Sequence, residues 1–139
     1  MKFEDMDVWK DASRLSVSVY RELAHLKDYG FKDQITRSGL SISSNIAEGF
    51  GRSTDKDKRN FLNYARGSCA EFRSQTYIGI KAGFIDQAVG SSWVNESNKI
   101  SAMLTRLMTY LSRNNPDERP GTNDQGQTTN NVLPIDAIY

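Results

Sequence analysis

Three arginines recur at every seventh position in the middle of the chain, at Arg59, Arg66 and Arg73, and Tyr77 continues the same line. In a helix this spacing keeps the arginine side chains within about 40° of one another and about 10 Å apart along the axis. Guanidinium groups at such intervals can follow a phosphate backbone, and a terminal aromatic ring can stack on a base. The pattern is therefore compatible with nucleic-acid binding.

The arginine line also has a purely structural explanation. The side chains can pair with carboxylates such as Glu48 or Glu71, or be solvated on the outer face of the helix. The net charge of the chain is only +1, with −3 in residues 114–139 and about +4 in residues 1–113, whereas dedicated nucleic-acid-binding domains are usually far more basic. On the residues alone the structural explanation is favoured, and an anionic partner is permitted but not required.

Catalytic and metal-binding groups are scarce. Glu22 and His25 have the Glu-x-x-His spacing that di-iron helix bundles use on two helices, but His25 is the only histidine, so the second motif cannot exist. The same count leaves no base for a triad other than His25. Cys69 is the only cysteine, which excludes an internal disulfide and a multi-thiolate metal site within one chain. We therefore expect a protein that is not an enzyme and that has no metal or cofactor.

The stretch SISSNIAEGFGR, residues 41–52, contains a weak trace of a glycine-rich phosphate loop. No strand precedes it, and Thr54 stands where a dinucleotide fingerprint needs its third glycine. The glycines are better explained as the end of a helix. In this region, only Arg52 and the unpaired N–H groups at the start of the next helix could still bind one anion.

Four segments carry apolar residues at helical spacing, and none has the alternation of a strand. They span about residues 5–27, 31–50, 55–82 and 91–112. Amphipathic helices joined by short connections are typical of an antiparallel bundle. The sequence therefore predicts an all-α fold, an up-down-up-down four-helix bundle in residues 1–113.

The first helix is apolar over more than one core-facing stripe, because Trp9 and Tyr20 lie beside the stripe. This excess predicts cover from a neighbouring subunit of a homo-oligomer or from the tail. The acidic N-terminus lacks the features of a secretory signal, and no run of 18 apolar residues occurs. We therefore expect a cytoplasmic protein that does not span a membrane.

Residues 114–139 form a tail that is polar up to its last eight residues, VLPIDAIY. A composition this poor in apolar groups predicts a mobile segment. The final string is then either a frayed end or a peptide that docks on a groove of this protein or of a partner.

The stretches SGLSISSNIAEGFGRS and RNFLNYARGSCAEFRSQ, with VWKDASRLSVSVY in the first helix, closely resemble the signature of the bacterial four helix bundle family. Its members are also called intervening-sequence or 23S rRNA-associated proteins and are often labelled S23 ribosomal protein. The resemblance spans about residues 5–112. It implies a non-enzymatic homo-oligomer, a pentameric barrel in related proteins, whose basic outer surface contacts RNA or DNA.

The resemblance also assigns positions. The family's basic positions are Arg37, Arg52 and Arg66, and its signature positions are Asn45, Glu48, Gly67, Ser68 and Glu71. Many members carry two adjacent arginines and two alanines before the SI motif, whereas this chain has Thr36-Arg37-Ser38-Gly39. The basic surface here is therefore thinner than in much of the family.

Two hypotheses follow from the sequence. In the first, the homo-oligomer binds RNA or a ribonucleoprotein through Arg37, Arg52, Arg59, Arg66, Arg73 and Tyr77. In the second, the ring is a protein–protein adaptor that uses its grooves and its C-terminal peptide without nucleic acid.

Overall fold

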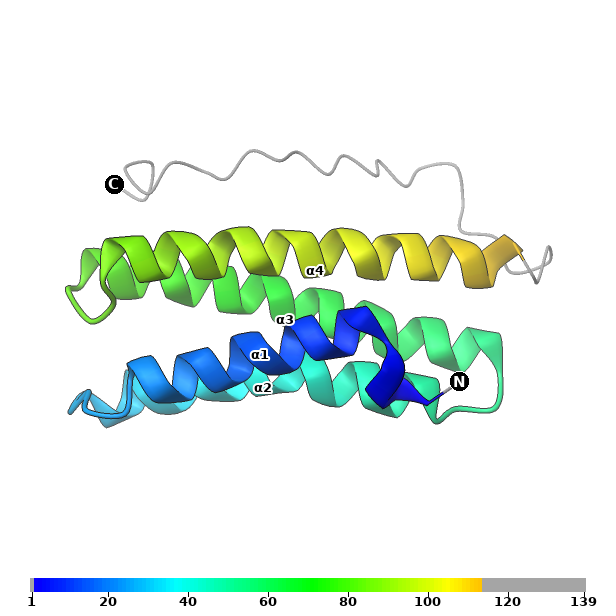
Figure 1. Cartoon of the computed structure of the whole chain (residues 1–139), viewed down its shortest axis with the longest axis horizontal. Helices are drawn as coiled ribbons and strands as arrows, with labels where there is room; N and C mark the ends of the chain where they lie inside the picture. The colour runs from blue at the N-terminus through cyan, green and yellow to red at the C-terminus, as the bar shows by residue number, and fades with distance from the viewer. Residues whose placement is uncertain (1, 114–139) are drawn as a thin grey trace.

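The computed structural model describes residues 2–113, which form one bundle of four long helices (Figure 1). The elements are η1, a 3₁₀ helix over Phe3–Asp5, then α1 (Asp7–Glu22), α2 (Tyr29–Phe50), α3 (Asp55–Lys81) and α4 (Gln87–Arg113). Residues 114–139, and with them both predictions for VLPIDAIY, a frayed end or a docking peptide, lie outside the described residues.

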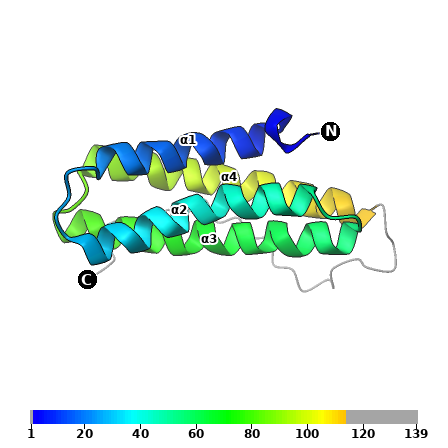
Figure 2. The same cartoon turned by 90° about the horizontal axis from the view of Figure 1, so that it is seen from below.

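Consecutive helices run in opposite directions along the bundle (Figures 1 and 2). α2 and α4 each pack against both α1 and α3, so the four helices occupy the corners of a square. No strand occurs in residues 2–113. The predicted all-α, up-down-up-down four-helix bundle is confirmed.

Two helix boundaries differ from the prediction. α1 ends at Glu22 rather than near Lys27 because Leu23 and Leu26 reach the core from a turn, in which the Leu26 N–H donates to the Leu23 carbonyl. Because Leu23 and Leu26 are three residues apart within this turn, their spacing matches that of a helix and extends the predicted helix too far. α4 begins four residues before the predicted Ser91 because Asp86 Oδ2 accepts from the N–H groups of two residues in the first turn.

The core is a continuous apolar layer that all four helices share. Its largest fully buried side chains include Phe72, Ile35, Ile42, Ile46, Leu62, Ile100 and Leu104. At Gly39 a Cβ atom would lie 3.6 Å from the Phe72 ring, an ordinary van der Waals contact, so this position of α2 faces the ring of α3. Within residues 2–113 no helix combines the length and the hydropathy that a membrane span needs.

The α3–α4 connection is tight. Gly83 has φ = 81°, a left-handed conformation that glycine adopts at no steric cost, and it ends α3. A Cβ atom on Gly90 would lie 2.3 Å from Ile80 Cδ1, so only glycine fits there without a shift. These two glycines fix how α4 starts against α3.

Candidate nucleic-acid and assembly surfaces

The predicted arginine line lies in the seam between α3 and α4. Each arginine donates a hydrogen bond from Nη1 to a hydroxyl on α4: Arg59 to Ser112 at 3.2 Å, Arg66 to Thr105 at 3.3 Å, and Arg73 to Ser97 at 3.3 Å. All three arginines are half-buried. The seam therefore holds three guanidinium groups in a row, each positioned by an oxygen of the neighbouring helix.

The charges of Arg66 and Arg73 are not neutralised by a carboxylate within residues 2–113. Within residues 2–113, Arg66 donates besides Thr105 only to the side-chain oxygen of Asn63, at 2.9 Å. The two carboxylates that sequence reasoning offered as partners are engaged elsewhere, Glu48 with Arg52 and Glu71 with Gln75. Neutral oxygens orient these guanidinium groups and leave their positive charge in place.

Tyr77 lies at the Arg73 end of the line and is half-buried. Burial raises the pKa of its phenol, and the positive charge of Arg73, about one helical turn away, opposes that rise. The structure thus brings four of the six predicted nucleic-acid-binding residues, Arg59, Arg66, Arg73 and Tyr77, onto one flank of α3.

Arg37 and Arg52 lie apart from this line. Arg37 Nε donates to Asp33 on the same exposed turn of α2, at 3.1 Å. Arg52 follows the end of α2, pairs with Glu48 and lies over the Phe61 ring, 4.4 Å from its centroid. The six predicted residues therefore do not form a single surface.

The start of α3 is poorly suited to an anion. The Thr54 hydroxyl caps the helix by accepting from the Asp57 N–H at 3.1 Å. Two aspartates, at positions 55 and 57, occupy the first turn. Their negative charge already complements the helix dipole that an anion would use.

Several signature residues join α2 to α3 on the opposite flank of α3. The hydroxyls of Ser41 and Ser68 are 2.9 Å apart, and Asn45 Nδ2 donates to the carbonyl and the hydroxyl of Ser41. One helical turn away, Ser38 Oγ donates to Gln75 Oε1 at 2.6 Å. The Ser41–Ser68 and Ser38–Gln75 bonds cross a half-buried interface, so they fix the register of the two helices, while Asn45 holds Ser41 within α2.

Gly67 is the signature residue without an internal role. It is exposed in the middle of α3, and a Cβ atom there would meet no atom within 4 Å. Glycine in an exposed helix interior costs about 1 kcal/mol relative to alanine. Two exposed apolar side chains, Tyr64 and Ile78, lie on the same side of α3, within about 60° of Gly67 by helical geometry.

A second apolar face lies on α1 and α2, where Val17, Tyr20 and Leu40 are between 45% and 49% exposed. Trp9 is only half-buried, and the Phe3 ring of η1 packs against it edge-on, with 5.2 Å between the ring centroids. Part of the predicted apolar excess is therefore covered by the chain's own N-terminus. Tyr20 remains open to a neighbour.

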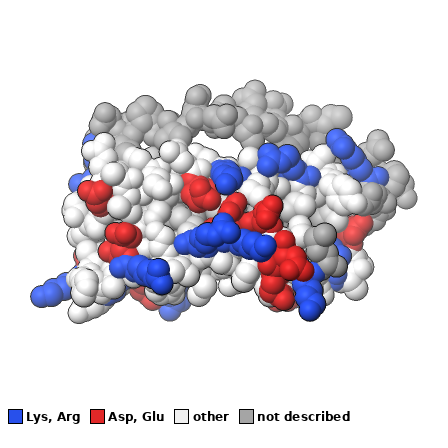
Figure 3. Space-filling view, in the orientation of Figure 1, with Lys and Arg blue, Asp and Glu red and all other residues white. Residues whose placement is uncertain are grey.

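Charge is mixed over the face that carries α1. Basic and acidic groups are interspersed there and form no broad patch of one sign (Figure 3). Asp11 accounts for part of this pattern because it pairs with Arg14 at 2.8 Å and with Lys99 of α4 at 3.5 Å.

Cys69 and His25 are the two residues most suited to catalysis or metal binding, and their surroundings differ. Cys69 is fully buried in the core, and burial raises the pKa of its thiol to about 12. His25 is exposed in the turn after α1. Within residues 2–113, no three metal-ligating side chains come together.

Comparison with known proteins places the bundle in a family. The model of the 23S rRNA-intervening sequence protein matches residues 4–106. The chain belongs to this family. A crystal structure of a protein of unknown function from the S23 ribosomal protein family of Bacteroides thetaiotaomicron VPI-5482 is 27% identical, with a TM-score of 0.69, and the match covers 73% of this chain and 97% of that one. No match is found among curated proteins.

The match to the 23S rRNA-intervening sequence protein family covers the α3–α4 seam up to Arg106, including Arg59, Arg66 and Arg73. Residues 107–139 follow the matched region, so the polar tail and VLPIDAIY are not part of it. The resemblance seen in the sequence motifs is confirmed.

Proposed function

We propose that this chain is a non-enzymatic, cytoplasmic protein that assembles into a closed homo-oligomer and associates with RNA or a ribonucleoprotein. The observation that carries the proposal is the row of guanidinium groups in the α3–α4 seam, held by Ser97, Thr105 and Ser112. Guanidinium donors fixed in advance lose less entropy when they bind phosphate. The family's description as a 23S rRNA-intervening sequence protein favours RNA as the polyanion.

Assembly into a ring is supported by two separate apolar faces. A cyclic oligomer larger than a dimer uses a heterologous interface, in which two different surfaces of each subunit meet. The face around Tyr20 and Leu40 on α1 and α2 and the face around Tyr64 and Ile78 on α3 are two such surfaces. The resemblance to pentameric barrels makes five subunits the proposed number.

A ring would also compensate for the weak net charge of a single chain. Residues 1–113 carry about +4, which is little for a protein that binds a polyanion. Repeating the seam around a ring multiplies the contacts without any new interaction within a subunit. Affinity then depends on assembly, so the two halves of the proposal are coupled.

The direct test is the affinity of the full chain for a structured ribosomal RNA fragment, measured by fluorescence anisotropy over a salt series. We expect Arg66→Glu/Arg73→Glu to lower the affinity by more than about tenfold at low salt and to flatten its salt dependence, because fewer counterions are released. Lys2→Glu/Lys27→Glu, at exposed positions away from the seam and from the proposed interface, is the matched control with the same change of charge, and should retain most of the affinity. No binding at low salt, or equal losses in the two variants, would contradict the proposal.

The alternative function is a protein–protein adaptor that binds no nucleic acid. The charges interspersed on the face that carries α1 (Figure 3) favour it, because that face creates little field for a polyanion. A ring that forms normally and binds no RNA at low salt would support the adaptor over the RNA-associated protein.

A further inference from the structure

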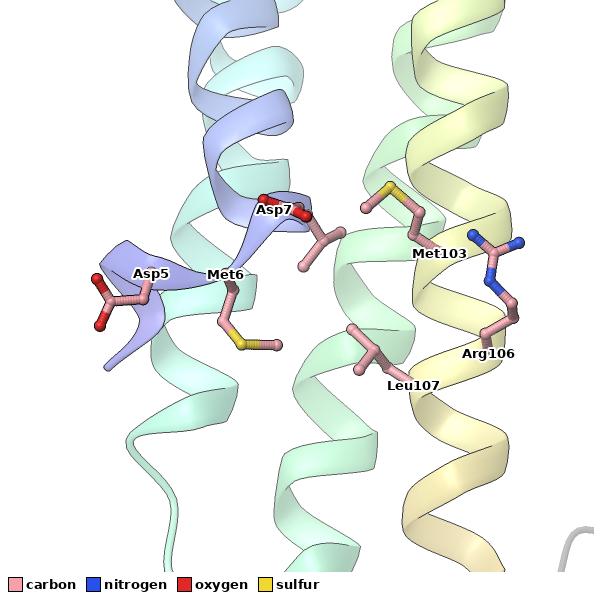
Figure 4. Close-up of a pocket in the computed structure, with 7 residues that line it drawn as sticks. Asp5, Met6, Asp7, Met103, Arg106 and Leu107 are labelled. Atoms are coloured by element: carbon pink, nitrogen blue, oxygen red, sulfur yellow. The ribbon is translucent and has the colours of Figure 1, made fainter. Parts of the chain in front are cut away.

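A groove of about 420 Å³ opens between the beginning of α1 and the C-terminal half of α4 (Figure 4). It is lined by Asp5, Met6, Asp7, Met103, Arg106 and Leu107. Its volume lies within the range of about 300–1,000 Å³ that ligand-binding clefts occupy. The α1–α4 seam is thus a surface distinct from the arginine row.

The walls of the groove are apolar and adaptable. Met6 and Leu107 face each other across it, and Met103 joins them from α4 (Figure 4). All three pack on the edge of the core yet remain partly open to solvent. Unbranched thioether side chains repack readily around apolar partners.

The rim of the groove carries opposite charges on its two sides. Asp5 and Asp7 stand on the α1 side, and Arg106 stands on the α4 side (Figure 4). Arg106 is exposed and makes no ion pair within residues 2–113. An apolar peptide with a single acidic residue matches this pattern when its carboxylate lies on the α4 side.

We propose that the groove binds the C-terminal segment of the same chain, residues 132–139, VLPIDAIY. The segment supplies apolar side chains for Met6, Met103 and Leu107, and Asp136 supplies one carboxylate for Arg106. Residues 114–139 carry a net charge of −3, and residues 1–113 carry about +4. The long-range force between them is therefore attractive, as is the local force between Asp136 and Arg106. This interaction is independent of the proposed RNA association.

The position of the groove fits the length of the tether. α4 ends at Arg113, and α1 begins at that same end of the bundle (Figure 1). Leu107 therefore lies only about 9 Å along the helix axis from the start of the tether. A random coil as long as residues 114–131 spans about 23 Å, which covers that distance. At an effective concentration on the order of millimolar, a weakly binding peptide occupies the groove.

Amide hydrogen exchange on the full chain tests the docking. We expect the amides of residues 132–139 to exchange about tenfold more slowly than those of residues 121–131, because a docked segment is protected while it is bound. Leu133→Asp/Ile135→Asp should abolish this difference. Thr128→Asp/Thr129→Asp adds the same charge to the tether and should leave the protection unchanged.

Methyl NMR of the methionines locates the contact. On comparing the full chain with Leu133→Asp/Ile135→Asp, the ε-methyl signals of Met6 and Met103 should shift, whereas Met108, which does not line the groove, should not. Arg106→Glu should weaken the protection of residues 132–139, and adding Asp136→Arg should restore it. Failure of this charge exchange would overturn the assignment of Asp136 to Arg106.

Three outcomes would overturn the proposal. The first is equal exchange rates in residues 132–139 and in the tether, with unmoved methionine signals. The second is protection that grows with protein concentration, which would assign the segment to the groove of a second copy. The third is protection only after another protein is added, which would make the segment a partner-binding peptide.

Discussion

The Arg66 guanidinium donates to the Thr105 hydroxyl at 3.3 Å and so links the middle of α3 to the C-terminal half of α4. Arg59 and Arg73 make equivalent bonds on either side of it, to Ser112 and Ser97. One row of side chains therefore both stabilises a helix pair and presents positive charge. Tests of the row must separate these two effects, and changes to the hydroxyls do so because they leave the charge intact.

Thr105→Val should lower the free energy of unfolding by about 1 kcal/mol, the net value of a typical hydrogen bond. It should also weaken RNA binding severalfold, since Arg66 would keep its charge but lose its positioning partner. Urea unfolding and RNA anisotropy measure the two effects. Thr109→Val is the matched control, because the Thr109 hydroxyl bonds only to the Thr105 carbonyl, and its change should stay within about 0.5 kcal/mol. Equal effects of the two substitutions would contradict a positioning role for Thr105.

Gly67→Ala should stabilise an isolated subunit by about 1 kcal/mol, because the new methyl group meets open space and alanine favours the helix. It should at the same time weaken assembly if the α3 face contacts a neighbouring subunit closely. Gly90→Ala is the contrast, since its Cβ would overlap Ile80 and cost about 1–3 kcal/mol. Thermal unfolding and native mass report both quantities. If the Gly67→Ala variant assembles normally, the α3 face is not part of the interface.

The buried thiol should make stability depend on pH in the alkaline range. Burial raises the pKa of Cys69 from 9.0 to about 12, against the opposing charge of Arg73. Below pH 9 the thiol is protonated in both the folded and the unfolded chain, so its contribution to the free energy of unfolding is fully present. Above pH 9 the unfolded chain releases the proton and the folded chain retains it, so about 1 kcal/mol is lost between pH 8 and pH 10. Urea unfolding of the wild type and of Cys69→Ala at both values isolates this loss, and a difference between them that does not change with pH would contradict it.

Tyr20→Glu/Leu40→Glu should reduce the native mass towards that of a monomer, because it places two charges on the proposed apolar interface. The fold should survive, since both side chains are about half exposed. Tyr110→Glu on α4, where the tyrosine is 60% exposed, is the control and should assemble normally. Far-UV circular dichroism and analytical ultracentrifugation check the two parts. Normal assembly of the double variant would exclude this face as the interface.

Helical periodicity was sufficient to predict the four helices and their antiparallel order, because each helix buries one stripe in a shared core. It misplaced the end of α1 because Leu23 and Leu26 keep the helical spacing from within a turn. The start of α4 depended on Asp86, a capping residue that the apolar pattern does not include. A polar cap therefore sets the start of α4, whereas periodicity reports only buried faces.

The spacing of Arg59, Arg66 and Arg73 placed them on one face, and the structure agrees. Their partners Ser97, Thr105 and Ser112 could not be predicted, because the register between α3 and α4 depends on tertiary packing and not on either helix alone. The hydroxyls do recur at intervals of seven and eight residues, a signal that becomes useful once two helices are known to pair. The contact of Phe3 with Trp9 could not be predicted either, because a short 3₁₀ helix leaves no periodic trace in the sequence.

The native mass of the purified full chain, measured with and without nuclease treatment, tests the central claim most directly. The proposed ring predicts a mass near five times the 15.7 kDa of one chain. It also predicts co-purifying RNA that is released by high salt and is lost in Arg66→Glu/Arg73→Glu. A 15.7 kDa particle that carries no nucleic acid at low salt would contradict both the assembly and its association with RNA.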